Sequence, residues 1–288
     1  MDELEDIMSY ETIWITGAKG RVGTALIKEL SKNTAYKVIG TDMDVDITDI
    51  DEVERMVQLY RPNAIVNCAA ITDKDFCEKN MVEAFKVNAL GARNMAIAAR
   101  GANCKLIHLS TDDVFDGRQS GRWNEFDNPN PKSTYAKSKY AGEQYVRNLC
   151  VKHLIVRSSW VYGGETANDY FAECVKYGKA GEIFYAPVDF VSAPTSIDEY
   201  VAVIAKVIDS VEYGTIHAAC EGMCTRNEFA QFVLGLMGYN VGLAKGSFLE
   251  KEPASTLLDN LMLKMTELHE MSHWQDALKA YAEKVKAE

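Results

Sequence analysis

The sequence predicts an α/β fold with a doubly wound parallel sheet, followed by a smaller C-terminal domain. Two observations predict this fold. Short β-branched or apolar segments alternate with segments of helical apolar spacing along residues 12–160, and a glycine-rich turn joins the first such pair. Because helices separate successive strands, we expect the strands to run parallel and the helices to cover both faces of the sheet.

The first β-α unit is the most clearly marked. Residues 12–16 are β-branched and aromatic and end at Gly17, while apolar residues at helical spacing follow over 22–30. A second strand is predicted at 36–41. The elements predicted next are a helix at 49–60 that stops at Arg61-Pro62, a strand at 64–68, a helix at 81–100, a strand at 105–110, a helix at 135–150 and a strand at 153–157.

The pattern is less regular after Tyr162. A helix at 196–210 and a strand at 214–219 are expected to return to the sheet. We therefore expect one domain from residues 12–160 together with these two elements. Residues 161–195 and 220–288 are expected to form the smaller domain, as a helical cap.

Bulk composition narrows the class of protein. The 288 residues carry a formal net charge of −11, which disfavours nucleic acid as a partner because phosphates would be repelled. No apolar run approaches the roughly 18 to 20 residues needed to cross a bilayer, so we expect no membrane association. The acidic stretch Met1 to Glu11 is unlike a signal peptide, and seven scattered cysteines are typical of a reducing compartment. We expect a cytoplasmic protein.

Two pairs of residues have side chains that can bind metals. Cys220 and Cys224 lack a second pair at zinc-finger spacing, and His269 and His273 lack an obvious third ligand. We therefore expect packing or surface roles for both pairs, and no metal site.

The turn after the first predicted strand contains Gly17, Gly20 and Gly23 at three-residue intervals. At such a turn, backbone amides and the helix N-terminus can receive a pyrophosphate. The alternative is a turn that only packs the helix against the strand. A strand before the turn and a helix after it favour the dinucleotide interpretation.

Asp42 follows the second predicted strand, where a carboxylate can accept hydrogen bonds from adenosine ribose hydroxyls. This position favours NADH over NADPH. Lys19 and Arg21 can nevertheless attract a 2'-phosphate, and Asp42 can also be a plain turn residue, so both cofactors stay open.

Tyr135 and Lys139 stand at i and i+4, which places both side chains on one face of the predicted helix. A phenol has a pKa near about 10, but a neighbouring ammonium and a cationic oxidised nicotinamide favour its phenolate and make it a competent acid/base. The alternative is a solvated helix face. Ser110 and Thr111 favour the acid/base interpretation over a solvated helix face, because they end the preceding strand at the edge where open α/β sheets bind ligands.

Together these residues resemble the extended short-chain dehydrogenase/reductase superfamily, and more narrowly the dTDP-4-dehydrorhamnose reductase family, over about residues 12 to 240. The motifs that carry the resemblance are Thr16-Gly17-x-x-Gly20-x-x-Gly23, Asn67-Cys68-Ala69-Ala70, Ser110-Thr111-Asp112-Asp113-Val114-Phe115-Asp116-Gly117, Asn128-Pro129-Asn130-Pro131, Tyr135-x-x-x-Lys139 and Arg157-Ser158-Ser159-Trp160-Val161-Tyr162-Gly163.

The resemblance implies a Rossmann domain that binds NADH or NADPH, a smaller substrate-binding domain, and reduction of the C4 keto group of a nucleotide-linked 4-keto-6-deoxy sugar. Thr111, Tyr135 and Lys139 match the catalytic positions, with Tyr135 protonating the alkoxide and Lys139 holding the nicotinamide ribose. Thr111, Asp112 and Trp160 match substrate contacts, although Trp160 can also be a core aromatic residue. The cofactor-binding residues expected from the motifs and the resemblance are Gly17, Gly20, Arg21, Val22, Gly23, Asp42, Asp46, Ile47, Cys68, Ala69, Ala70, Asn88, Ser110, Tyr135 and Lys139.

Departures from the family lie on the substrate side. Asp113 stands where the family has tyrosine, the segment 189–195 departs from the family's Asp-Gln-x-Gly-x-Pro-Thr, and Glu252-Pro253 replaces an Arg-Pro pair. The resemblance therefore implies a nucleotide-sugar substrate without identifying the sugar. The alternatives are another nucleotide-sugar reductase or epimerase, or a non-catalytic regulatory subunit of the same fold. A second copy of the chain is a candidate partner.

Overall fold

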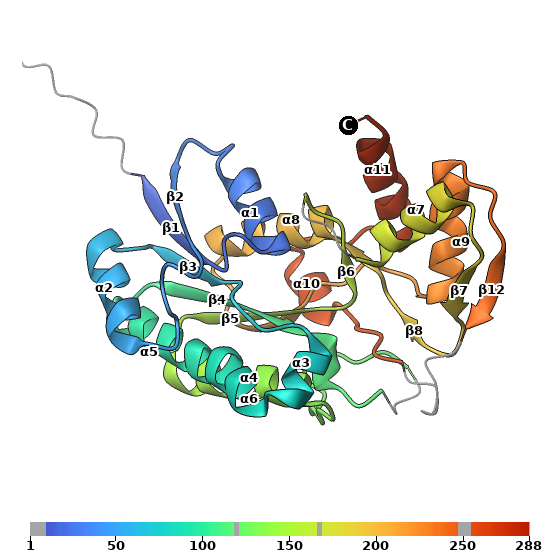
Figure 1. The fold of residues 1–288 in the computed structure, drawn as a ribbon. Coiled ribbons are helices and arrows are strands. Elements are labelled where there is room, and N and C mark those ends of the chain that lie inside the picture. Colours follow the sequence, from blue (N-terminus) through green and yellow to red (C-terminus); the bar gives the residue numbers. More distant parts are fainter. Residues whose placement is uncertain (1–9, 118–120, 166–168, 247–254, 288) are drawn as a thin grey trace, which may run out of the picture.

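A six-stranded parallel sheet forms the centre of the molecule (Figure 1). The structure is a computed structural model that describes residues 10–117, 121–165, 169–246 and 255–287. The prediction of a doubly wound parallel sheet is confirmed. In spatial order the strands are β10 (Gly214–His217), β5 (His153–Ser158), β4 (Lys105–Thr111), β3 (Ala64–Asn67), β1 (Glu11–Thr16) and β2 (Tyr36–Thr41).

Each face of the sheet is covered by its own helices and apolar core. Along β1, Ile13 and Ile15 join one buried cluster while Trp14 joins the other, as strand periodicity requires. The first cluster lies under α1 (Arg21–Leu30) and α8 (Ile197–Asp209), and the second lies under α2 (Ile50–Tyr60), α5 (Ala92–Gly101) and α6 (Thr134–Leu149).

The predicted helix at 81–100 is present but contains a π-helical turn in its middle. The chain forms α3 (Lys74–Lys79), which was not predicted, α4 (Met81–Phe85), a π-helical turn (Lys86–Gly91) and α5. Asn88 lies in this turn and bonds Ile71 through its side chain, while a Cβ at Gly142 of α6 would come within 2.4 Å of the Asn88 carbonyl oxygen. π-helical turns occur often at functional sites, and this one brings Asn88 against α6.

The C-terminal part is not purely helical, which corrects the predicted helical cap. Its helices are α7 (Tyr170–Ala180), α9 (Arg226–Met237), α10 (Leu261–Thr266) and α11 (Trp274–Ala287). Three two-stranded sheets pair β6 (Val161–Tyr162) with β9 (Thr195–Ser196), β7 (Phe184–Pro187) with β12 (Leu243–Gly246), and β8 (Val191–Ser192) with β11 (Cys224–Thr225). Such short strands lack the length for a clear alternation of polar and apolar residues.

The predicted return of residues 196–219 is visible in the sheet. β10 pairs in parallel with β5, and α8 packs on the face that α1 covers. The assignment of cofactor and substrate binding to two separate domains stays a prediction.

The cysteines are free thiols, and all but the half-buried Cys68 lie in the interior. Within the described ranges, no helix is long and apolar enough to cross a membrane, and no cluster of His, Cys, Asp and Glu is suited to a metal ion.

Candidate active site

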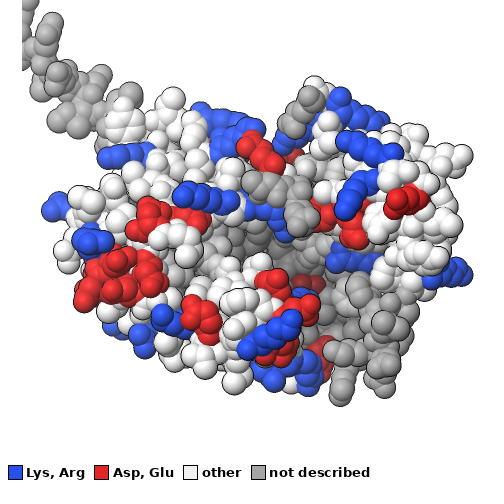
Figure 2. Space-filling model, viewed as in Figure 1, with Lys and Arg blue, Asp and Glu red and all other residues white. Residues whose placement is uncertain are grey.

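A cavity of about 400 Å³ opens where the glycine turn, the end of β4, the start of α6 and the start of α9 converge. Figure 2 shows this face of the molecule hollowed between the sheet and the C-terminal part. The predicted site residues that line the cavity are Arg21, Val22, Cys68, Ala70, Ser110, Thr111, Asp112, Tyr135, Lys139 and Trp160. Those that do not line it are Gly17, Gly20, Gly23, Asp42, Asp46, Ile47, Ala69 and Asn88.

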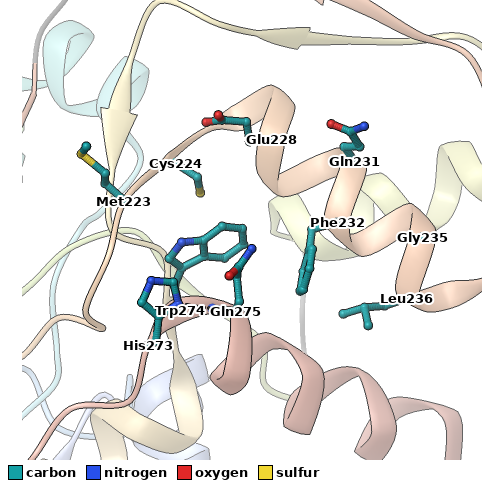
Figure 3. Close-up of a pocket in the computed structure, with 10 residues that line it drawn as sticks. All are labelled: Met223, Cys224, Glu228, Gln231, Phe232, Gly235, Leu236, His273, Trp274 and Gln275. Carbon is teal, nitrogen blue, oxygen red and sulfur yellow. Dashed lines mark hydrogen bonds between the residues drawn. The ribbon is translucent and has the colours of Figure 1, made fainter.

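A larger cavity, of about 670 Å³, lies between α9 and the start of α11 (Figure 3). Phe232, Leu236 and Trp274 form much of its wall, together with the backbone at Gly235. It contains none of the predicted site residues. We therefore assign the chemistry to the smaller cavity, where the predicted phenol, hydroxyl and ammonium meet.

Tyr135 is buried at the start of α6, with only 8% of its surface exposed. The sequence predicts that Lys139 favours its phenolate. In the structure the pKa of Tyr135 is instead raised, because burial and the charge of Asp113 outweigh a hydrogen bond with the Thr111 side chain. The phenol is therefore the stable form, which suits a group that gives its proton away.

Lys139 lies one helical turn further along α6 and is also buried. Its Nζ donates a hydrogen bond to the carbonyl oxygen of Leu109 at 2.6 Å. Burial lowers the pKa of Lys139 to about 8, although the nearby Glu143 favours the charged form. The ammonium is held by the end of β4, close to Ser110 and Thr111.

The start of α6 is held by polar contacts from two directions. Ser133 caps the helix by accepting a hydrogen bond from the amide of Ala136, and Glu78 of α3 accepts hydrogen bonds from the amide and hydroxyl of Thr134, each at 2.7 Å. Asn88 donates to Ser138 Oγ at 3.0 Å. The Asn88 side chain thus links Ile71 to α6, and its expected contact with the cofactor stays a prediction.

Deeper in the sheet, α6 is bound through Glu143. Its carboxylate accepts hydrogen bonds from Arg157 Nε at 2.9 Å, Arg157 Nη2 at 2.6 Å and Ser110 Oγ at 2.6 Å. Glu143 and Arg157 are almost completely buried. This bidentate ion pair ties the helix of Tyr135 and Lys139 to β4 and β5.

The glycine turn fits a dinucleotide. Gly17 has φ +64°, and a Cβ there would lie 2.7 Å from the amide nitrogen of Ala69, while a Cβ at Gly23 would lie 2.2 Å from the Gly17 carbonyl oxygen. Gly20 precedes α1 without a side-chain cap, so the first amides of the helix remain available to a phosphate.

Asp42 lies beside this turn and accepts a hydrogen bond from the Lys19 amide at 2.9 Å. The Arg21 guanidinium, which was expected to attract a 2'-phosphate, instead bonds the Val161 carbonyl at 3.2 Å and the Asp169 carboxylate at 3.3 Å. Asp42 therefore lies at the glycine turn, while the Arg21 guanidinium is bonded to the C-terminal part.

Two neighbouring carboxylates face the substrate side of the cavity. Asp112 accepts a hydrogen bond from Thr256 Oγ1 at 2.5 Å, and its pKa is raised to about 7 by burial and by the charge of Asp113. Asp113, a departure from the family pattern, forms a salt bridge with Lys74 of α3 at 2.7 Å. Lys74 offsets part of this charge, which still raises the pKa values of Asp112 and Tyr135. The departure at Glu252-Pro253 lies outside the described residues.

Asp112→Asn is expected to gain stability over the wild type as the pH rises from 5 to 8. In the unfolded chain Asp112 is ionised over this range, whereas the folded protein keeps it protonated until about pH 7, so its buried charge lowers the free energy of unfolding at pH 8. The expected change in the difference between variant and wild type is on the order of 2 kcal/mol. Urea unfolding at both pH values measures it. Asp75→Asn, at an exposed residue, is the control. If the free energy of unfolding changed equally with pH in all three proteins, the raised pKa of Asp112 would be contradicted.

Trp160 follows β5 and has φ +38°, an unusual conformation for a bulky residue. The Arg226 guanidinium lies over its ring, 3.5 Å from the centroid. The flat face expected to receive a sugar is therefore covered on one side by a cation, and Trp160 is neither a simple core residue nor an open platform.

Sequence reasoning missed Lys74 and Arg226 as residues of this cavity. The pattern Thr225-x-x-Glu228 does mark the start of a helix at Arg226, and both side chains form the capping box in the structure. No local spacing connects that helix with Tyr135, so this signal predicts a helix end but not a site.

Comparison with known proteins gives consistent results. A protein-family model described as RmlD substrate binding domain matches residues 11–287. The chain is 33% identical to dTDP-4-dehydrorhamnose reductase from Aggregatibacter actinomycetemcomitans, and the alignment covers 93% of this chain and 98% of that protein.

Solved structures agree with this likeness. The fold is similar to that of dTDP-4-dehydrorhamnose reductase (rfbD) from Bacillus anthracis in complex with NADP, with a TM-score of 0.92, 34% identity and coverage of 96% of this chain and 99% of the other. A dTDP-4-dehydrorhamnose reductase ortholog from Clostridium acetobutylicum has a TM-score of 0.91 and 36% identity, again covering 96% and 99% of the two chains.

Proposed function

The chain belongs to the RmlD substrate-binding domain family, and from this premise we propose that it is a nicotinamide-dependent reductase of a nucleotide-linked 4-keto-6-deoxy sugar, dTDP-4-dehydrorhamnose in the first instance. The product would be dTDP-rhamnose. The observation that carries the proposal is the convergence of Thr111, Tyr135 and Lys139 in one cavity beside the glycine turn.

Each of these side chains has a chemical role in the proposed reaction. NADH or NADPH supplies the hydride that adds to C4 when the cofactor is bound. Tyr135 donates its phenolic proton to the carbonyl oxygen as it becomes an alkoxide, and the Thr111 hydroxyl donates a hydrogen bond to the same oxygen. Lys139, fixed by Leu109, holds the nicotinamide ribose and provides positive charge beside the phenolate that Tyr135 leaves.

The cofactor we favour is NADH. Asp42 is placed to accept hydrogen bonds from ribose hydroxyls and would repel a 2'-phosphate, while Arg21 is paired with Asp169. The relative from Bacillus anthracis was solved with NADP, so the comparison leaves the preference open.

The test is an assay of the purified chain with dTDP-4-dehydrorhamnose and either NADH or NADPH, following the loss of nicotinamide absorbance. We expect turnover with both cofactors and a higher kcat/KM for NADH. A non-catalytic regulatory role predicts cofactor binding without turnover. If the wild type reduced several 4-keto sugars no faster than Tyr135→Phe, the reductase proposal would be contradicted.

We further propose that different parts of the chain bind the cofactor and the sugar nucleotide. Residues 12–160, together with 196–219, would bind the cofactor, and residues 161–195 and 220–288 would bind the sugar nucleotide. A homodimer remains a proposal to be tested by sedimentation. The free thiols favour a cytoplasmic site of action.

A further inference from the structure

The cations of the active-site cavity differ in whether they have partners. Arg21 forms a salt bridge with Asp169, Lys74 forms one with Asp113, and Lys139 donates to the Leu109 carbonyl. Arg226 lines the same cavity, yet among the residues that the structure describes its guanidinium has no hydrogen-bond acceptor or carboxylate partner. The N–H donors of Arg226 are therefore available to a ligand in the cavity.

Arg226 is held in place by aromatic rings rather than by counter-charges. Its guanidinium lies 3.5 Å from the centroid of Trp160 and 4.7 Å from that of Tyr170. The Tyr170 hydroxyl donates to the backbone carbonyl of Arg226 at 3.2 Å, and the capping box of Thr225 and Glu228 fixes the start of α9. Stacking uses the face of a guanidinium and leaves the N–H donors at its edge free.

The guanidinium of Arg226 is half-buried in the cavity wall. Burial lowers the pKa of Arg226 to about 10, so the group is still charged at neutral pH but has lost much of its hydration. A charge that has lost part of its hydration is stabilised when an opposite charge or a ligand lies beside it. Asp112 is close enough to favour the charged form of Arg226, but it is itself mostly uncharged below pH 7. The missing counter-charge is therefore expected from the ligand.

We propose that Arg226 binds the diphosphate of the nucleotide-sugar substrate, a role that rests on the proposed function. A guanidinium is suited to this task because its planar donors match two phosphate oxygens at once. The rings of Trp160 and Tyr170 would hold that fork in a single orientation, so little side-chain entropy is lost on binding. Arg226 thereby becomes a residue that selects for a diphosphate-linked sugar over a free sugar.

The test compares Arg226→Gln with the wild type in steady-state kinetics. Because the diphosphate does not change during reduction, we expect KM for the nucleotide sugar to rise roughly 10- to 100-fold with kcat changed only a few-fold. Inhibition by dTDP should weaken by a similar factor, whereas inhibition by thymidine, which lacks phosphate, should stay within about twofold. Arg226→Lys should be intermediate, since it keeps the charge and loses the fork.

Control measurements separate charge from folding. Arg55→Gln removes one exposed positive charge from α2, at a residue that does not line the cavity, and should leave KM and the dTDP inhibition constant unchanged. NADH binding, followed by fluorescence, and the thermal unfolding midpoint should be the same in Arg226→Gln and the wild type. Unchanged KM and dTDP inhibition in Arg226→Gln, or equal weakening of dTDP and thymidine, would overturn the role of Arg226.

Failure of the proposed function is distinguishable from failure of this inference. If the wild type reduces no 4-keto sugar, calorimetry with dTDP alone still tests whether Arg226 binds a diphosphate. Binding of dTDP that weakens at least tenfold in Arg226→Gln, but not in Arg55→Gln, supports the anion site without the reductase activity. A wild type that binds no dTDP overturns the inference.

Discussion

Tyr135→Phe is expected to lower kcat for keto-sugar reduction by about 10²- to 10⁴-fold, the usual contribution of a positioned general acid. The phenylalanine keeps the ring in its buried place at the start of α6 and removes only the proton donor. Binding of NADH and of the sugar nucleotide should change little, so the loss should appear in kcat rather than in KM. Single-turnover measurements of nicotinamide oxidation would place the defect in the chemical step.

Tyr145→Phe is the matched control for this variant. Tyr145 lies on the same helix but is 38% exposed and is not among the residues that line the cavity. It should retain wild-type kcat. If Tyr135→Phe kept more than about a tenth of the wild-type rate, another group would have to be the proton donor.

The largest effect on stability is expected from Glu143→Ala. The carboxylate is fully buried and accepts two hydrogen bonds from Arg157 and one from Ser110. Its removal leaves the Arg157 cation buried without a counter-charge, which should lower the free energy of unfolding by about 3 to 5 kcal/mol. Urea unfolding followed by circular dichroism measures the loss. Because the pair joins α6 to β4 and β5, activity should fall as well.

Two further variants test the cause of that loss. Glu29→Ala breaks the exposed pair with Lys32 and should change the free energy of unfolding by less than about 1 kcal/mol. Replacing both Glu143 and Arg157 by apolar residues should recover part of the stability, since no lone charge remains buried. A loss below about 1 kcal/mol in Glu143→Ala would mean that the ion pair contributes little.

The charged side chains on the substrate side of the cavity differ in whether they are paired with an opposite charge. Asp113 is paired with Lys74, whereas Arg226 stacks on Trp160 and keeps its charge available. Lys74 offsets part of the Asp113 charge, and Arg226 adds a positive charge to the same cavity.

Local patterns in the sequence were sufficient for the parallel sheet, the glycine turn, and the helix that carries Tyr135 and Lys139. Each depends on spacing within one strand, one turn or one helix, where covalent geometry determines which side chains share a face. The sequence therefore determined the α/β fold and the placement of Tyr135 and Lys139 on one helix.

Only the tertiary structure decided the charges around that pair. The contacts of Lys74 with Asp113, Glu143 with Arg157 and Arg226 with Trp160 join different elements of the fold. The raised pKa of Tyr135 likewise comes from burial and from Asp113, not from its neighbour on the helix. Burial and charge pairing depend on which elements pack together. That packing cannot be predicted from the spacing of residues within one element.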